Sequence, residues 1–372
     1  MSVLLRVVLD QLVAGSDPDL AAASRELAQA LVQTAPSGCE VGAIVPAGDE
    51  LAIAGIDDVR RLAMGRRELA AAWQLGVTAG VGGGLIHSPT LLAPLSRHDR
   101  ANDHDQTVVT LWDLQPWEHP EELSRPQLTW HKAMLKRARK HADAIVVPTH
   151  AMARRLEALV DVGSRARVIP GAAPSVFAVP TDAVGRRRTL AIPEAHIALV
   201  GDAAPSAALA VGFAAVGAAG TGLPIVVLGA REGEEPEIVD LAEASGIAGS
   251  RVHVRPGADA ADRAAILDAS VLLVAPSRRA AFPWRVLGAM KLSVPIVAVA
   301  SADHREGIVD GGTGVGDPED GEGDATAMGA AIAEALAADG ALDRLGVLAG
   351  DRGRAFSWLA AADRVWQLHA DL

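Results

Sequence analysis

Short apolar runs alternate with Ala-rich amphipathic stretches along most of the chain, and this alternation restricts the fold more than any other feature. Such an order is typical of a parallel sheet that is covered by helices on both faces. In the first half, the runs that predict strands are 4–9, 41–45, 84–87, 107–112, 144–147 and 167–169. The stretches that predict helices are 20–33, 59–75, 126–142 and 151–160.

A second series of the same kind follows a segment rich in Pro, Ala and Gly, residues 170–184. Its expected strands are 195–200, 224–228, 252–255, 271–275 and 295–300. Its expected helices are 207–217, 237–245 and 260–268. A chain of 372 residues also exceeds one ordinary core, so we expect an α/β protein with two doubly wound domains. Ligands of such sheets bind at the carboxyl ends of the strands, which predicts a site in the cleft between the domains.

Composition restricts the partners and the compartment. The net charge of −12 disfavours a broad nucleic-acid-binding face. The single cysteine, Cys39, excludes an internal disulfide framework and a Cys-based zinc cluster, and we interpret it as a small core residue. We see no secretory signal and no run of ~20 uncharged apolar residues, which predicts a cytoplasmic protein without a transmembrane span. The acidic, Gly-rich stretch 310–324 predicts a mobile loop.

The most specific motif is the segment 276–290, with the sequence PSRRAAFPWRVLGAM. It lies between two apolar runs, so we interpret it as a loop and the start of a helix that connect two strands. Its frame resembles the donor-sugar loop of family 4 retaining glycosyltransferases. That loop has proline-serine, two residues, glutamate, glycine and phenylalanine, and later glutamate-alanine-methionine. Ala280 and Gly288 replace the two glutamates.

Further pieces of the chain follow in the order of the same family. They are 84–89, 107–114, 119–121, 142–149, 167–171, 200–201, 269–270 and 356–359. The resemblance spans nearly the whole chain and is strongest to actinobacterial proteins labelled mannosyltransferases. It implies the GT-B architecture, with two Rossmann-like domains that face a central cleft. Residues 1–175 would form the acceptor-side domain, 176–355 the nucleotide-sugar-side domain, and 356–372 a C-terminal helix that packs back on the first domain.

The resemblance also implies a reaction. Such enzymes transfer a hexosyl group, here mannosyl by resemblance, from a nucleotide-diphosphate sugar to a glycan or lipid-linked acceptor, with retention of the anomeric configuration. They use no metal and no further cofactor. Arginine, lysine and the N–H groups of a helix N-terminus would therefore have to stabilise the charge that develops on the diphosphate.

Carried over position by position, the resemblance indicates the site residues. Asp113 is the catalytic candidate, and His87 and Trp112 are the acceptor-side candidates. The donor-side candidates are Gly15, Gly201, Ser206, Ser277, Arg278, Arg279, Arg285 and Glu306. Structural alternatives stand beside these roles: a turn or helix cap for Asp113, a buried core position for His87, and a favourable charge at a helix start for Glu306. The arginines could instead form a solvated loop face, as loop arginines usually do.

Several polar positions of the family pattern are replaced. Ser206 and Ala207 stand where the family has arginine and lysine, and Trp112 stands where it has histidine. The glycine-rich first loop corresponds to residues 15–19, which hold one glycine, two carboxylates and a proline without an N–H group. Two hypotheses follow. The chain is an active transferase with an altered site, or it is an inactive homologue that acts as partner or regulatory subunit of an active transferase. A nucleotide-sugar epimerase lacks a supporting motif.

Two further patterns have alternative interpretations. Trp112, Trp117 and Trp130 flank the expected acceptor region, where aromatic faces could stack on sugar rings, but Trp130 lies on the apolar stripe of its helix and is predicted to be core. The stretch 126–142 carries five lysines and arginines from position 132 onward. It could contact the inner face of a membrane peripherally, or form a solvated helix face, which we favour.

Overall fold

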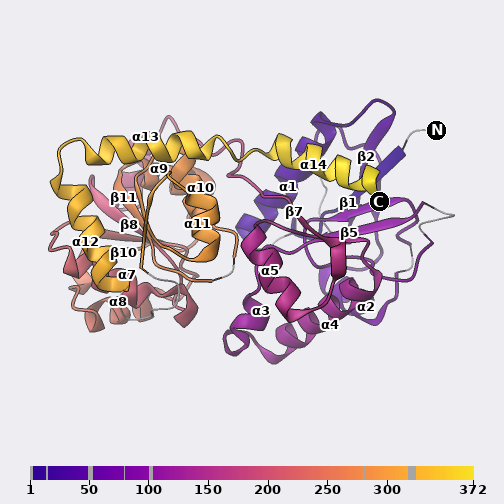
Figure 1. Ribbon diagram of the computed structural model, residues 1–372, viewed down its shortest axis with the longest axis horizontal. Coiled ribbons are helices and arrows are strands. Elements are labelled where there is room, and N and C mark those ends of the chain that lie inside the picture. Colours follow the sequence, from indigo (N-terminus) through magenta and orange to yellow (C-terminus); the bar gives the residue numbers. More distant parts are fainter. Residues whose placement is uncertain are drawn as a thin grey trace. The chain divides into compact units, whose positions relative to one another are not determined.

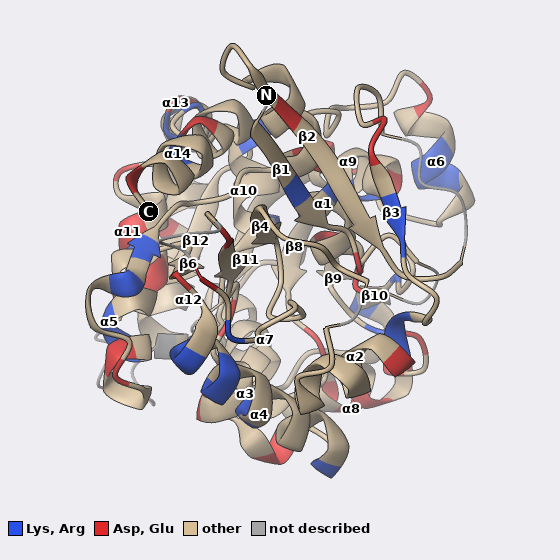
Figure 2. Ribbon diagram, turned by 90° about the vertical axis from the view of Figure 1, so that its right-hand side faces the viewer, with Lys and Arg blue, Asp and Glu red and all other residues tan. Residues whose placement is uncertain are grey.

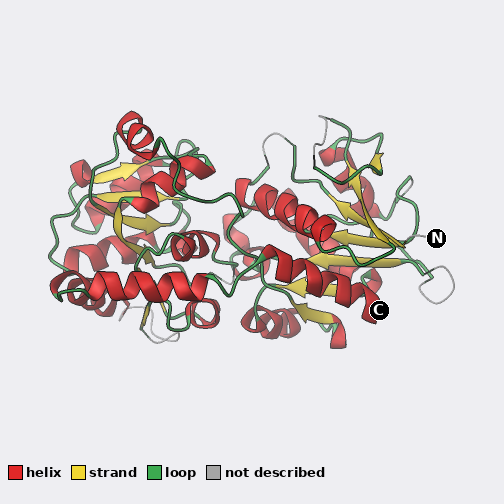
Figure 3. Cartoon of the chain, turned by 90° about the horizontal axis from the view of Figure 1, so that it is seen from above, coloured by secondary structure: helices red, strands yellow, loops and turns green. Residues whose placement is uncertain are grey.

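The computed structural model describes residues 3–13, 16–48, 53–78, 80–99, 104–279, 281–316 and 324–372. The chain divides into two compact units, which we call unit 1 (Met1–Ser175 with Ser357–Leu372) and unit 2 (Val176–Phe356). Each unit is a parallel β-sheet with helices on both faces (Figures 1 and 3). The prediction of an α/β protein with two doubly wound sheets is confirmed.

Within the described residues, the sheet of unit 1 has seven strands in the order β3-β2-β1-β4-β5-β6-β7. The strands are β1 (Val3–Val8), β2 (Cys39–Val45), β3 (Val59–Arg61), β4 (Leu85–Ser88), β5 (Gln106–Thr110), β6 (Ala144–Val147) and β7 (Ala166–Val168). The helices are α1 (Pro18–Gln33), α2 (Arg66–Leu75), α3 (Gln115–Glu118), α4 (Arg125–His141), α5 (His150–Leu159) and α14 (Trp358–Asp371). The order of the strands reverses between β1 and β4.

The sheet of unit 2 has six described strands in the order β10-β9-β8-β11-β12-β13. The strands are β8 (His196–Val200), β9 (Ile225–Leu228), β10 (Val252–Val254), β11 (Ser270–Ala275), β12 (Ile296–Val299) and β13 (Thr313–Val315). The helices are α6 (Ala183–Thr189), α7 (Leu209–Ala218), α8 (Glu235–Ala244), α9 (Ala260–Asp268), α10 (Trp284–Lys291), α11 (Ala302–Ile308), α12 (Asp324–Ala337) and α13 (Ala341–Gly353). Here the order of the strands reverses between β8 and β11.

The strands are apolar because helices cover both faces of each sheet. Every residue of β6 and of β9 is buried, on whichever face its side chain lies. The largest fully buried side chains include Trp73 in unit 1 and Phe213 in unit 2. Since all the strand pairs are parallel, the carboxyl ends of the strands lie along one edge of each sheet.

The C-terminal helix α14 packs against α1 in unit 1 (Figure 1). Trp366 donates a hydrogen bond from Nε1 to the carbonyl oxygen of Leu31 at 3.1 Å. His369 and Gln106 join α14 to β5 through Nδ1 and Oε1, which lie 2.8 Å apart. The expectation that the C-terminal helix packs on the first domain is therefore confirmed.

Two of the expected segments differ in the structure. The expected helix 59–75 is wrong over its first part, because Val59–Arg61 pairs with β2 as the edge strand β3 and the helix starts only at Arg66. Strand β13 lies within the stretch expected to be a mobile loop, of which residues 317–323 lie outside the described part. The linker expected to run from residue 170 to about 184 agrees with the structure, in which α6 begins at Ala183.

Two surface features complete the fold. The arginines of α6, blue in Figure 2, connect it to α9: Arg186 pairs with Asp262 at 2.8 Å, and Arg187 pairs with Asp268 at 3.1 Å. The free thiol of Cys39 is half-buried at the start of β2 rather than in the core.

Among the described residues, no single helix is both long and apolar enough to cross a membrane.

His98 forms an ionic contact at the amino edge of the sheet in unit 1. Its Nε2 lies 2.8 Å from Asp143 Oδ2, and its Nδ1 lies 3.0 Å from the carbonyl oxygen of Ser96. Both ring nitrogens thus face acceptors, which suits the imidazolium form. The hydrogen bond to Asp143, with a smaller contribution from the Ser96 carbonyl, raises the pKa of His98 above its ordinary value although partial burial opposes this.

We predict that His98 makes the stability of unit 1 depend on pH. Because its pKa is raised in the folded state, its contribution is complete below the unfolded pKa of about 6.5 and is lost as the pH rises through the folded value. The His98→Gln variant should therefore lose stability relative to the parent at about pH 6 and match it more closely at about pH 9. Urea unfolding followed by tryptophan fluorescence measures this, because six of the seven tryptophans lie in unit 1. An equal difference at both pH values would contradict the prediction.

Candidate functional site

Unit 2 has a cavity of about 150 Å³ at the carboxyl ends of β8, β9 and β11. It lies at the point where the order of the strands reverses, which is the usual ligand position in doubly wound sheets. Its wall includes Gly201, Asp202, Ser277, Arg279, Arg285 and His304. An edge-to-face pair formed by Phe282 and Trp284, with ring centroids 4.6 Å apart, adds an apolar side.

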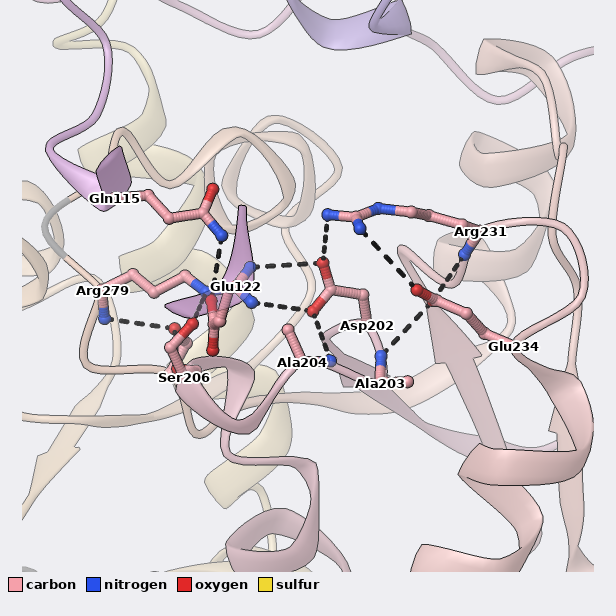
Figure 4. A network of polar contacts seen from close by, with 10 residues as sticks. Gln115, Glu122, Asp202, Ala203, Ala204, Ser206, Arg231, Glu234 and Arg279 are labelled. Carbon is pink, nitrogen blue, oxygen red and sulfur yellow. Dashed lines mark hydrogen bonds and ion pairs between the residues drawn. The ribbon is translucent and has the colours of Figure 1, made fainter. Parts of the chain in front are cut away.

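Asp202 is the centre of the polar network in this cavity (Figure 4). Its Oδ1 accepts hydrogen bonds from Arg279 Nη2 at 2.8 Å and from the backbone N–H of Ala204 at 3.2 Å. Its Oδ2 accepts from Arg231 Nη2 at 3.1 Å and from Arg279 Nη1 at 3.3 Å. Glu234 Oε2 supports the same loops by accepting from the N–H groups of Arg231 and Ala203. No motif in the sequence assigns Asp202, Arg231 or Glu234 to a site.

The loops after β8 and β11 are joined by hydrogen bonds around Ser206. The hydroxyl of Ser277 donates to the carbonyl oxygen of Ser206 at 3.2 Å and accepts from the N–H of Arg279 at 3.2 Å. Ser206 Oγ accepts from Arg279 Nε. Ser206 stands where the resemblance expects a cation, so a guanidinium from the opposite loop lies beside that position.

Arg285 lies over the backbone at the end of β9. A Cβ atom at Gly229 would be 3.2 Å from Arg285 Nε and 3.1 Å from the carbonyl oxygen of Gly201. The φ angle of Gly229 is +114°, which also favours glycine. Arg285 and Gly201 both line the cavity. Arg278 is half-buried in the loop before α10.

Glu306 does not lie at a helix start. Helix α11 begins at Ala302, and Ser301 caps it by accepting a hydrogen bond from the N–H of His304 at 3.2 Å. Glu306 is the fifth residue of the helix, and its carbonyl oxygen accepts from Arg352 Nη2 at 2.9 Å. The interpretation of Glu306 as a favourable N-terminal charge is therefore wrong, because its carboxylate lies toward the negative end of the helix dipole.

Phe177 fills the space beside Gly288, the position of the second glutamate in the family pattern. A Cβ atom at Gly288 would lie 3.1 Å from Phe177 Cε1 and 3.4 Å from Cζ. Phe177 is only 6% exposed, so it has little room to withdraw. A larger side chain at position 288 would thus require repacking of Phe177. Ala280, at the position of the first glutamate, lies outside the described residues.

Unit 1 has its own cavity of about 220 Å³ at the carboxyl ends of β1, β4 and β5. Its wall includes Asp17, Arg66, Asp113, Trp117, Trp130 and His131. The carboxylate of Asp10 is fully buried and accepts from Arg66 Nε at 3.0 Å, Thr90 Oγ1 at 3.0 Å and Gln11 Nε2 at 2.6 Å. Burial raises the pKa of Asp10, and Arg66 counteracts this. Sequence analysis did not name Asp10, although it follows an apolar run directly.

Asp113 and Trp112 both line the cavity of unit 1. Asp113 Oδ1 accepts a hydrogen bond from the N–H of Gln115 at 3.1 Å. This is a turn contact, which the sequence analysis gave as the alternative to a catalytic role. Trp112 is 7% exposed and donates from Nε1 to the carbonyl oxygen of Pro89 at 2.8 Å. Its ring also packs edge-to-face on Trp358 of α14, which makes it mainly a core residue. Trp130, predicted as core, is half-buried and lines the same cavity.

His87 is fully buried in β4. Its Nε2 lies 3.4 Å from Thr110 Oγ1, and its ring centroid lies 5.7 Å from that of His369. Burial lowers the pKa of His87 well below its ordinary value, and the nearby His369 adds to this. His87 is therefore a buried core histidine, which was the alternative to an acceptor-side role in the sequence analysis. Gly15 lies outside the described residues, and Asp17 in the same loop caps α1 by accepting from the N–H groups of Asp19 and Leu20.

The whole chain has the same fold as several solved structures. These include sucrose-phosphate synthase from Thermosynechococcus elongatus (20% identity, TM-score 0.73, 99% of this chain and 98% of that chain). WaaG, a glycosyltransferase involved in lipopolysaccharide biosynthesis, is similar over 97% of this chain and 98% of its own (14% identity, TM-score 0.70). Anabaena HepE in complex with UDP-glucose is similar over 99% of this chain and all of its own (15% identity, TM-score 0.69). The architecture is GT-B.

A family similarity covers part of unit 2. Residues 208–338, about a third of the chain, match the family described as Glycosyl transferases group 1. This region contains Ser277, Arg279 and Arg285 of the cavity in unit 2. No curated protein sequence matches the chain.

We predict that Phe177 and Gly288 are energetically coupled. The Gly288→Glu variant should destabilise unit 2 by about 1–3 kcal/mol, because the new side chain overpacks against Phe177. In the Phe177→Ala background the cost of Gly288→Glu should be smaller by about 1 kcal/mol or more. Hydrogen exchange of peptides from unit 2 measures the four stabilities of this double-mutant cycle. Equal costs in the two backgrounds would show that the contact does not restrict position 288.

Proposed function

We propose that the chain is a retaining glycosyltransferase that transfers a hexosyl group from a nucleotide-diphosphate sugar. The observation that carries the proposal is the cavity of unit 2, where Arg279 and Arg285 meet at the reversal point of the sheet. Two arginines, a serine hydroxyl and the glycine backbone at the cavity wall suit a diphosphate leaving group. The family similarity of residues 208–338 supports the same assignment.

Arg279 would supply the positive charge that an arginine and a lysine supply in the family pattern. Its guanidinium reaches Ser206, which stands at the position of the missing arginine. In this proposal Arg279 and Arg285 stabilise the charge that develops on the diphosphate, and Ser277 orients the loop. Arg278, Gly201 and Glu306 are further donor-side residues on the strength of the resemblance, and Gly15 belongs to the loop that would approach the phosphates.

The acceptor would bind in the cavity of unit 1. Asp113 is proposed to orient the attacking hydroxyl group, and Trp117 and Trp130 offer apolar faces for a sugar ring. Trp112 would act as a wall of this site. His87 could contribute as a positioning residue through Thr110, which it contacts and which lines the cavity. A glycan or a lipid-linked sugar has the hydroxyl groups that this site requires.

Two similarities indicate which nucleotide and which sugar the donor contains. HepE has been solved with UDP and with UDP-glucose, which supports a uridine nucleotide. The resemblance to actinobacterial mannosyltransferases supports a mannosyl donor. Both donors belong in the test of the proposal.

A specific observation favours a second candidate, a homologue without transfer activity that serves as partner of an active transferase. Phe177 occupies the space beside Gly288, and Asp202 places a carboxylate against Arg279. The first arrangement leaves little room for the glutamate that the family pattern has at position 288, and the second engages the guanidinium that is proposed to bind the diphosphate. Such a protein would bind a nucleotide or a partner but would release no nucleoside diphosphate from a sugar donor.

We predict that nucleoside diphosphates stabilise the chain and that Arg279 carries much of this effect. Calorimetric titration and thermal unfolding with UDP, GDP and ADP, and with UDP-glucose and GDP-mannose, measure the binding. The Arg279→Gln variant should bind the preferred nucleotide about 10-fold or more weakly, since a hydrogen bond to a charged group contributes about 1.5–3 kcal/mol.

The matched control is Arg188→Gln, which removes an exposed arginine of α6 in the same unit. Its affinity should equal that of the parent. An absence of any shift at millimolar nucleotide would contradict a nucleotide-sugar site. Binding without release of nucleoside diphosphate, over a panel of glycan acceptors, would favour the second candidate.

A further inference from the structure

The carboxylate of Asp202 is held as a bound anion would be. Its side chain is 9% exposed, and its two oxygens accept four hydrogen bonds. Arg279 binds both oxygens in a fork, Arg231 binds one of them, and the N–H of Ala204 binds the other. Two guanidinium groups with a backbone N–H are a donor set that proteins use for phosphate oxygens.

Three loops contribute to this donor set. Asp202 and Ala204 follow β8, Arg231 follows β9, and Arg279 follows β11 (Figure 4). The set therefore lies where the carboxyl ends of neighbouring strands converge, next to the cavity of unit 2. Arg279 is 19% exposed, whereas Arg231 is 65% exposed, so the inner guanidinium is the better shielded from solvent. A ligand phosphate in this cavity would compete with Asp202 for Arg279, the guanidinium of this set that lines the cavity.

We propose that Asp202 is an internal competitor for the anionic group of the ligand. Its carboxylate occupies the oxyanion position of unit 2, and a diphosphate binds there only after Asp202 has released Arg279 and Arg231. The inference rests on the proposed function, since it assigns a form of regulation to the nucleotide site. Each guanidinium has the Asp202 carboxylate as an anionic partner, with Arg279 Nη2 at 2.8 Å and Arg231 Nη2 at 3.1 Å.

The Asp202→Asn variant tests this competition directly. The amide keeps the size of the side chain and an oxygen acceptor for the N–H of Ala204, but it removes the charge that holds the two arginines. Isothermal titration with inorganic pyrophosphate should then give a dissociation constant about 10-fold or more below that of the parent. UDP and GDP should show the same direction of change. Uridine and guanosine, which carry no phosphate, should bind equally to both proteins.

The matched control is Glu234→Gln, which removes an equal charge from the same network. Its Oε1 lies 3.9 Å from Arg231 Nη1, and its Oε2 accepts from backbone N–H groups. Its pyrophosphate affinity should change by less than about 3-fold. The double variant Asp202→Asn with Arg279→Gln should lose the gain of the single variant. Asp202→Ser, whose hydroxyl can also accept from Ala204, is the second variant if the amide does not fold.

The outcomes separate this inference from the proposed function. Tighter pyrophosphate binding by Asp202→Asn, with unchanged nucleoside binding, supports the competition. If the parent binds nucleoside diphosphates and the variant binds them equally or more weakly, the inference is overturned and the proposed nucleotide site survives. If neither protein binds pyrophosphate or nucleotide, both are overturned. If only the variant binds, the competition holds and the parent is the non-catalytic homologue.

Discussion

The burial of parallel strands on both faces is the constraint on which the rest of this structure depends. Helices cover each sheet on two sides, so the strand interiors are apolar and polar side chains have few positions near the sheet other than the strand ends. Parallel pairing then collects the carboxyl ends at one edge. In unit 2 the polar network of Asp202, Arg231 and Arg279 follows three strands at that edge, and in unit 1 Asp10, Thr90 and Asp113 do the same.

Electrostatics decides what the cavity of unit 2 can bind. The family pattern places an arginine and a lysine after the first strand of this unit, and here that loop offers Ser206 and Asp202 instead. Two arginines from other loops contact these residues: Arg279 donates to Ser206, and Arg231 donates to Asp202. The loops at this edge therefore hold two guanidinium groups against the carboxylate of Asp202, and the residues that supply each charge differ from those of the family pattern.

The sequence predicts strands and helices correctly where their residues are apolar and buried. It does not predict elements or contacts that depend on residues distant in the sequence. The run 144–147 is predicted and observed with the same ends, because every one of its residues is apolar and buried. Strand β3 was missed because Val59–Arg61 is a short edge strand just before a helix, and it has only one apolar residue, Val59, from which a strand could be predicted. The contacts of Arg279 with Ser206 and of Phe177 with Gly288 join residues more than 70 positions apart. No local pattern contains such contacts.

The carboxyl edge of unit 2 is the proposed binding site of a nucleotide-diphosphate sugar. Hydrogen-deuterium exchange of the chain with and without UDP-glucose or GDP-mannose tests it most directly, since it locates the ligand on the backbone. The account predicts slower exchange in three segments, 201–207, 229–231 and 276–285, and no comparable change at the far end of the same strands. Protection that is absent from all three segments at saturating donor, or confined to unit 1, would contradict it.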